Sequence, residues 1–124
     1  MSEKLRIGVL GLTHDHVWAE VAAASECQSA ELVAAADPNE PLTERFTETY
    51  GCRVYEDATS LLKNEKLDAA YVFGSNLEGS HMAIEAMELG LHILIEKPLA
   101  ANLDDANQML VAARTNNVQL VVNW

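Results

Sequence analysis

Three short apolar runs in this sequence each end in residues that are able to bind a ligand or do chemistry. Leu5–Leu10 leads into a segment with one glycine and two histidines, Leu32–Ala36 leads into Asp37, and His92–Ile95 leads into Glu96 and Lys97. A glycine lets the backbone approach a ligand closely, imidazoles and an ammonium group donate hydrogen bonds, and carboxylates accept them. We therefore take these three segments as the candidate site.

The apolar runs are nearly continuous rather than alternating with polar residues, which is typical of strands buried on both faces of a parallel sheet. Six such strands are predicted, at Leu5–Leu10, Leu32–Ala36, Arg53–Tyr55, Ala69–Phe73, His92–Ile95 and Gln119–Val122. Helical spacing between them predicts five helices. The pattern indicates an α/β fold with a doubly wound, mostly parallel six-stranded Rossmann-type sheet, helices on both faces, and the strand order 3-2-1-4-5-6.

The helices are predicted from apolar residues that recur on one face. The expected buried stripes are Val17, Val21 and Ala24; Leu42, Phe46 and Tyr50; Leu61 and Leu62; Met82, Ala86 and Leu89; and Ala106, Met109, Leu110 and Ala113. Gly90 is expected to end one helix in a left-handed conformation, and Asn102 to cap the start of the next.

Composition limits the possible functions. The 124 residues are enough for one domain, and 8 basic against 19 acidic side chains give a net charge of −11. This excess repels phosphate backbones and anionic lipids, so no nucleic acid or membrane partner is expected. Cys27 and Cys52 have no disulfide or redox-motif spacing, and no apolar run approaches the roughly 20 residues of a membrane span. We expect a soluble cytoplasmic domain.

The segment after the first strand, Gly11 to His16, lies where dinucleotide-binding folds carry a Gly-x-Gly-x-x-Gly turn, which places a pyrophosphate on free N–H groups of the first helix. Only Gly11 is kept, with Thr13 and His16 at the second and third glycine positions. Asp37 follows the second strand about 20 residues later, where a carboxylate binds the ribose hydroxyls. Such a carboxylate repels a 2′-phosphate, which favours NAD over NADP. The alternative is that Asp37 only begins a turn.

His14 and His16 lie at the positive end of the predicted helix, where neutral imidazoles can donate to a phosphate oxygen, and Thr13 is a candidate N-cap. Two histidines with this spacing are also a possible zinc site. No third ligand is evident in the sequence, because His81 and His92 stand alone. No metal site is therefore predicted.

Taken together, these motifs resemble one known family. They are Gly8 and Gly11 around the first turn, Asp37-Pro38 after the second strand, Gly74-Ser75-Asn76 after the fourth, His81 opening the next helix, and Glu96–Ala100 after the fifth. The sequence from Arg6 to Asn123 is similar to the N-terminal domain of the glucose–fructose oxidoreductase, inositol dehydrogenase and rhizopine-catabolism family, Gfo/Idh/MocA.

The resemblance implies a role for each matching position. Gly8, Gly11, Leu12 and Thr13 match the pyrophosphate loop, Asp37 the ribose-binding acid, and Ser75 and Asn76 a loop beside the cofactor that usually reads Thr-Pro-Asn. His14, His16 and His81 complete the expected cofactor site. Lys97 matches a lysine near the nicotinamide that binds the reacting hydroxyl, and Glu96 and Pro98 shape its loop. Lys97 is thus the expected catalytic residue.

The family's second, mostly β domain follows the sixth strand and supplies the general base, and residues 1–124 do not include it. The resemblance therefore implies the NAD(P)-binding half of an oxidoreductase that acts on sugar, polyol or related hydroxyl or carbonyl groups by hydride transfer, with little turnover by this part alone. Apolar surface near Trp124 is expected to favour a homo-oligomer.

Two alternatives come from other classes of protein. A non-catalytic dinucleotide-binding or sensing module has the same turn and acid. A response-regulator receiver shares the alternating pattern and a Lys-Pro pair, but it needs an acidic pair after the first strand and a phosphate-accepting aspartate. Gly11-Leu12-Thr13 and Gly74-Ser75-Asn76 offer neither.

Overall fold

The computed structural model describes residues 3–123, apart from the side chains of Asn76 and Leu77. Its strands are β1 (Leu5–Leu10), β2 (Ala30–Ala36), β3 (Arg53–Tyr55), β4 (Ala69–Val72), β5 (His92–Glu96) and β6 (Leu120–Asn123). They form one sheet in the order β3-β2-β1-β4-β5-β6, and every pair of neighbours is parallel. The predicted sheet and strand order are confirmed, with strand ends that differ by one or two residues.

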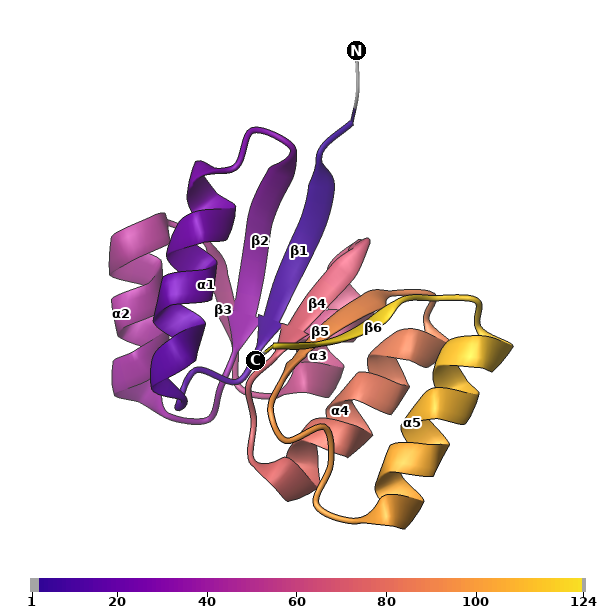
Figure 1. The fold of residues 1–124 in the computed structure, drawn as a ribbon. Coiled ribbons are helices and arrows are strands. Elements are labelled where there is room, and N and C mark those ends of the chain that lie inside the picture. The colour runs from indigo at the N-terminus through magenta and orange to yellow at the C-terminus, as the bar shows by residue number, and fades with distance from the viewer. Residues whose placement is uncertain (1–2, 124) are drawn as a thin grey trace.

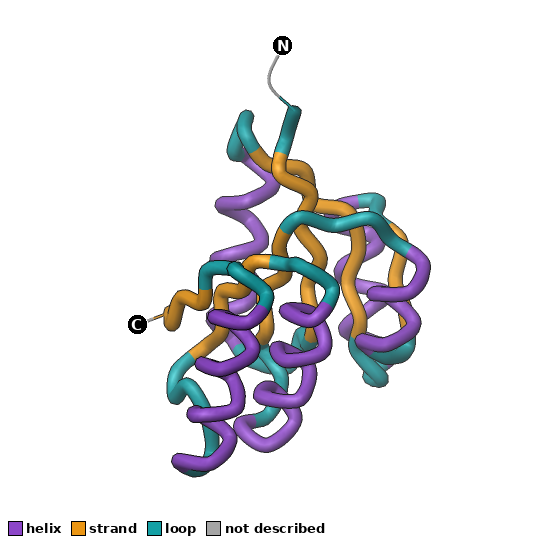
Figure 2. Tube along the Cα trace, turned by 90° about the vertical axis from the view of Figure 1, so that its right-hand side faces the viewer, coloured by secondary structure: helices purple, strands orange, loops and turns teal. Residues whose placement is uncertain are grey.

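The helices cover both faces of this sheet (Figure 1). They are α1 (Asp15–Glu26), α2 (Glu40–Tyr50), α3 (Ala58–Asn64), α4 (Asn76–Glu88) and α5 (Leu103–Thr115). One core lies under α1 and α2 and includes Val17, Phe46 and Phe73. The other lies under α3, α4 and α5 and includes Leu61 and Met109. Figure 2, seen from the side, shows α4 and α5 in front of the strands.

Two residues predicted to be buried are exposed instead. Leu89 is 59% exposed because α4 ends at Glu88, so Leu89 lies beyond the last regular turn, followed by Gly90 at a φ of 85°. The buried face of α4 is formed by Ala83, Ala86 and Met87.

In α5 the buried face is formed by Met109, Ala112 and Ala113. Leu110 is 41% exposed because it follows Met109 directly and so lies about 100° further around the helix. Asn102 caps α5 as predicted, since its side-chain oxygen accepts a hydrogen bond from the Asp105 N–H group at 2.8 Å.

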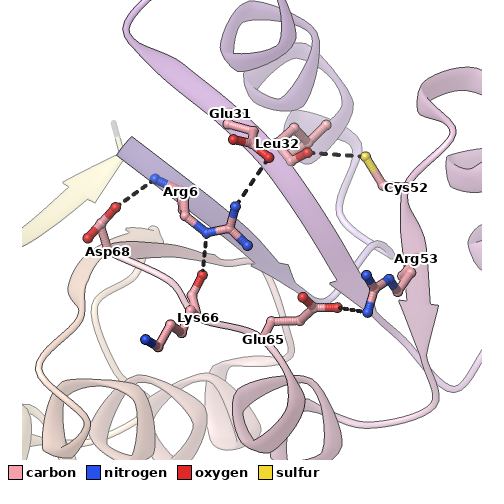
Figure 3. Close-up of polar contacts among 8 residues, drawn as sticks. All are labelled: Arg6, Glu31, Leu32, Cys52, Arg53, Glu65, Lys66 and Asp68. Atoms are coloured by element: carbon pink, nitrogen blue, oxygen red, sulfur yellow. Dashed lines mark hydrogen bonds and ion pairs between the residues drawn. The ribbon is translucent and has the colours of Figure 1, made fainter. Parts of the chain in front are cut away.

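Polar contacts join the elements at the end of the sheet where the central strand β1 begins (Figure 3). The Arg6 N–H group donates to the Asp68 carboxylate at 2.9 Å, and Arg6 Nε donates to the Lys66 carbonyl at 2.7 Å. The Arg6 guanidinium also pairs with Glu31 on β2 at 3.3 Å. These contacts tie β1 to β2 and to the segment before β4, while the predicted site lies at the opposite end.

Met109 and Leu110 offer a direct test of which face of α5 is buried. We expect Met109→Ala to lower the free energy of unfolding by about 2–5 kcal/mol, because it leaves a cavity in the core. The matched variant Leu110→Ala removes a half-exposed side chain and is expected to cost less than about 1 kcal/mol. Urea unfolding followed by circular dichroism measures both values, and equal losses would contradict the assigned face.

Candidate functional site

Gly11 turns the chain from β1 toward α1. Its φ is 98°, in the left-handed region, and its N–H group donates to the Ala36 carbonyl at 2.8 Å. A Cβ atom at this position would lie 2.8 Å from the backbone of both Phe73 and Gly74. The turn is therefore packed against the chain that follows β4, and only glycine fits there.

Asp37 fixes this turn from the end of β2. Its side chain is buried, and its Oδ2 atom accepts a hydrogen bond from the Leu12 N–H group at 2.7 Å. Its Oδ1 atom accepts from the Asn39 backbone N–H at 2.8 Å and from Asn39 Nδ2 at 2.7 Å. An ionised carboxylate accepts about four hydrogen bonds, so about one position is left for a ligand. The residue predicted to bind ribose thus also holds the first turn, a role that the sequence did not indicate.

The start of α1 differs from the sequence-based expectation. The prediction that Thr13 caps this helix is wrong, because α1 begins at Asp15 and its N-cap is His14. His14 Nδ1 accepts the hydrogen bond from the His16 N–H group at 3.1 Å. Leu12 is buried and held by Asp37, so the chain needs two more residues before it can enter the helix, and Thr13 is left exposed.

Glu96, at the end of β5, is brought against this same helix start. Its Oε2 atom lies 3.1 Å from His16 Nδ1, 3.9 Å from His14 Nδ1 and 3.2 Å from Asn123 Nδ2. Its Oε1 atom accepts from the Lys97 N–H group at 3.1 Å. The carboxylate is 5% exposed and joins α1, β5 and β6. The sequence indicated Glu96 and both histidines separately, but neither their contact nor Asn123.

The environment of Glu96 favours its charged form. Burial alone raises the pKa of its carboxyl group. The hydrogen bonds from Asn123, His16 and the N–H group of the next residue, together with the second imidazole, outweigh burial and hold the pKa below its ordinary value.

The other predicted site residues have different surroundings. Lys97 is exposed and directly follows Glu96. Ser75 is the N-cap of α4, where its hydroxyl oxygen accepts from the Glu78 N–H group at 3.2 Å. The Asn76 side chain lies outside the described residues. Gly8 lies inside β1, where a Cβ atom would be 2.6 Å from Leu67 Cδ1, so close packing accounts for this glycine.

His81 does not open α4 as predicted, because the helix already begins at Asn76. It faces a separate depression, the acidic hollow, with a volume of about 470 Å³. It is lined by Ala36, Asp37, Pro38, Glu56, Asp57, Ala58, Thr59, Glu78, His81, Met82 and Glu85. The hollow lies at the carboxyl ends of β2 and β3 beside the first turns of α4, where doubly wound folds bind ligands. Its lining has five carboxylates and neither lysine nor arginine.

Comparison with known proteins gives the family. Residues 5–124 match the Gfo/Idh/MocA family, described as an oxidoreductase family with an NAD-binding Rossmann fold. The chain belongs to this family. The resemblance seen in the sequence is thereby confirmed, and the receiver alternative is excluded.

Three relatives illustrate the family. A dTDP-3,4-didehydro-2,6-dideoxy-alpha-D-glucose 3-reductase from Actinomadura kijaniata is 30% identical over 97% of this chain and 36% of its own. The WlbA dehydrogenase from Bordetella pertussis, solved with NADH and UDP-GlcNAcA, has a TM-score of 0.91 and 25% identity over 99% of this chain and 36% of its own. A 3-ketoreductase from Actinomadura kijaniata, solved with TDP-benzene and NADP, has a TM-score of 0.88 and 29% identity over 98% of this chain and 38% of its own.

This chain therefore spans between 36% and 38% of the length of these family members, and corresponds to their Rossmann part. The two solved relatives carry different coenzymes, so both NADH and NADP occur in the family. Within residues 3–123, no helix has both the length and the apolar character that crossing a bilayer requires.

Gly11 and Gly51 test the packing of the first turn. Both have positive φ, but a Cβ atom at Gly51 meets nothing within 4 Å. We expect Gly51→Ala to cost only the left-handed strain, about 1–2 kcal/mol. Gly11→Ala adds a clash with backbone atoms and should lower the free energy of unfolding by at least about 1 kcal/mol more. Chemical denaturation measures the difference, and equal costs would show that the turn has room for a side chain.

The lowered pKa of Glu96 predicts that the stability of the fold depends on pH. Because its pKa is lower in the folded chain, its charge contributes stability that is fully present above its ordinary pKa of 4.5 and is lost as pH falls through the folded value. Glu96→Gln should therefore lower the free energy of unfolding at neutral pH, and the difference from the unmodified chain should shrink below that pKa.

Urea unfolding at a series of pH values checks this expectation. Asn123→Ala is the control, since it keeps the carboxylate but removes one of its hydrogen bonds, and it should show a smaller loss with the same trend. A difference between Glu96→Gln and the unmodified chain that does not change with pH would contradict the interpretation.

Proposed function

We propose that this chain is the NAD-binding half of an oxidoreductase that transfers hydride between the coenzyme and a hydroxyl or carbonyl group of a sugar, polyol or related small molecule. The observation that carries the proposal is the buried Asp37 carboxylate beside the Gly11 turn, with about one acceptor position left. Family membership supports it, because the family is described as NAD-binding oxidoreductases.

The residues around the turn suit the two ends of an adenosine diphosphate group. The start of α1 carries the positive end of the helix dipole, which favours a pyrophosphate, and its His16 and Val17 N–H groups are already paired with His14. His14 and His16 are partly exposed beside them and can donate to phosphate oxygens. The remaining acceptor position of Asp37 suits a ribose hydroxyl, and the acidic hollow next to it suits the adenosine.

The charge of the hollow supports NAD rather than NADP as the coenzyme. NADP differs by a 2′-phosphate on the ribose that Asp37 would bind. The lining offers this phosphate five carboxylates and neither lysine nor arginine. Coulomb repulsion therefore favours the coenzyme with a free 2′-hydroxyl.

Lys97 is the residue that we assign to the reacting group. NAD, when bound, supplies the hydride acceptor. As an alcohol carbon gives up hydride, its oxygen must lose a proton, and an ammonium group stabilises the developing negative charge by hydrogen bonding. Lys97 is exposed at the end of β5, at the same edge of the sheet as the Gly11 turn. The base that takes the proton, and the selection of substrate, belong to parts of the protein outside residues 1–124.

Two further features of the protein are proposed from its thiols and its exposed apolar side chains. We place it in the cytoplasm, since Cys27 and Cys52 are both free thiols, as in a reducing compartment. Leu103 and Val121 are exposed apolar side chains, which supports the expected homo-oligomer.

Coenzyme titration of Asp37 variants tests the proposal. We expect the unmodified chain to bind NADH more tightly than NADPH in a fluorescence titration. Asp37→Asn should weaken NADH binding about 10- to 100-fold, the value of a charged hydrogen bond, and reduce the preference for NADH. Unfolding should be measured alongside, since Asp37 also holds Leu12.

Glu56→Gln is the matched control, because it removes one negative charge from the hollow without touching the turn. It should leave NADH affinity nearly unchanged. Failure to bind either coenzyme at millimolar concentration, or a preference for NADPH, would overturn the proposal. Binding without oxidation of any sugar or polyol by the chain joined to a substrate domain would favour the sensing module.

A further inference from the structure

The fold brings together three side chains of types that commonly ligate metal ions. One ligand atom from each of His14, His16 and Glu96 lies within 4.8 Å of the other two. The two imidazole rings have centroids 4.7 Å apart and planes tilted by 55°, so they are not stacked on each other. The sequence showed the histidine pair but no third ligand. The structure supplies it from β5, 80 residues beyond His16.

We propose that His14, His16 and Glu96 form a binding site for a divalent transition-metal ion, with Zn²⁺ as the ion that best suits these donors. Two imidazole nitrogens and one carboxylate are a known zinc donor set, which leaves a fourth position to water or a ligand oxygen. Mg²⁺ and Ca²⁺ are not expected here, because they prefer sites built from oxygen.

The two distances from Glu96 to the imidazoles are close to those of a zinc site. Zinc bonds of about 2.0–2.2 Å place tetrahedral ligand atoms roughly 3.3–3.6 Å apart. His16 Nδ1 is already 3.1 Å from Glu96 Oε2, and His14 Nδ1 is 3.9 Å from it. An ion between Glu96 and His16 takes the place of the proton that they share, and that ring proton moves to Nε2. His14 exchanges its bond from the His16 N–H group for the metal.

Glu96 is prepared for this role before any ion binds. Its carboxylate is buried, and hydrogen bonds from Asn123 and the Lys97 N–H group fix its orientation. Such outer partners orient metal-binding carboxylates. The imidazoles are 40% and 56% exposed, so an ion can enter from solvent and keep a water molecule on its outer side.

The site uses residues of this chain alone and shares His14 and His16 with the proposed phosphate contacts, so Zn²⁺ binding is measured without coenzyme. The test is calorimetric titration of the chelator-treated chain with Zn²⁺, supported by the visible absorption of bound Co²⁺. We expect one Zn²⁺ ion per chain, and an absorption spectrum of bound Co²⁺ that is typical of a four-coordinate ion. His14→Gln and His16→Gln should each weaken Zn²⁺ binding by about tenfold or more.

His92→Gln is the control variant, since it removes one histidine that is exposed at the other end of β5. It should bind Zn²⁺ as the unmodified chain does. Asn123→Ala should weaken binding less than the loss of a ligand, and circular dichroism verifies that each variant is folded.

Three results would overturn the proposal. The first is no Zn²⁺ binding by the unmodified chain. The second is binding that survives in both His14→Gln and His16→Gln, which would place the ion elsewhere, for example at the exposed thiol of Cys27. The third is Mg²⁺ binding as tight as that of Zn²⁺.

Discussion

The hydrogen bond from the Leu12 N–H group to the buried Asp37 carboxylate is the constraint on which the candidate site depends. It joins the turn after β1 to the end of β2, and it gives a buried N–H group a charged acceptor. Hydrogen bonds to charged acceptors are among the stronger ones in proteins, and leaving such a donor unpaired is costly. The bond therefore fixes the direction in which the chain leaves Gly11 and enters α1.

The Glu96 carboxylate fixes the chain on the other side of the turn. Glu96 holds the start of α1 through His16 and the last residue of β6 through Asn123. Between them, Asp37 and Glu96 connect the ends of β2, β5 and β6 to one short loop. Of the two motif-glycine positions that Thr13 and His16 occupy in this chain, the second thus makes a side-chain contact with Glu96 that a glycine could not make.

The sequence was most informative where burial alone decides structure. Continuous apolar runs predicted the other strands and a weaker run predicted β3, and the parallel order followed from right-handed crossovers between them. Gly11 and Asp37 were found because their chemistry is local to strand ends. The contact between His16 and Glu96 was not found, since it depends on how two distant strand ends align in space.

The predictions of the cap of α1 and of one buried position in α5 are wrong for reasons that lie in the neighbouring residues. The Thr13 hydroxyl suits an N-cap, but the position of the cap is decided by where the helix begins. Leu12 is buried in the turn before it, and α1 begins only at Asp15. Leu110 was assigned to the core because it is apolar, although its neighbour Met109 already occupies the buried face. Residue type alone does not distinguish two adjacent apolar positions on a helix.

The acidic hollow has a consequence for how any anionic ligand approaches it. Five carboxylates line the hollow, and the whole chain carries a net charge of −11. Mobile counterions shorten the range of this field to about 8 Å at physiological ionic strength. Added salt therefore lowers the barrier to entry for a negatively charged molecule, the reverse of its effect on proteins that attract such molecules with a basic surface.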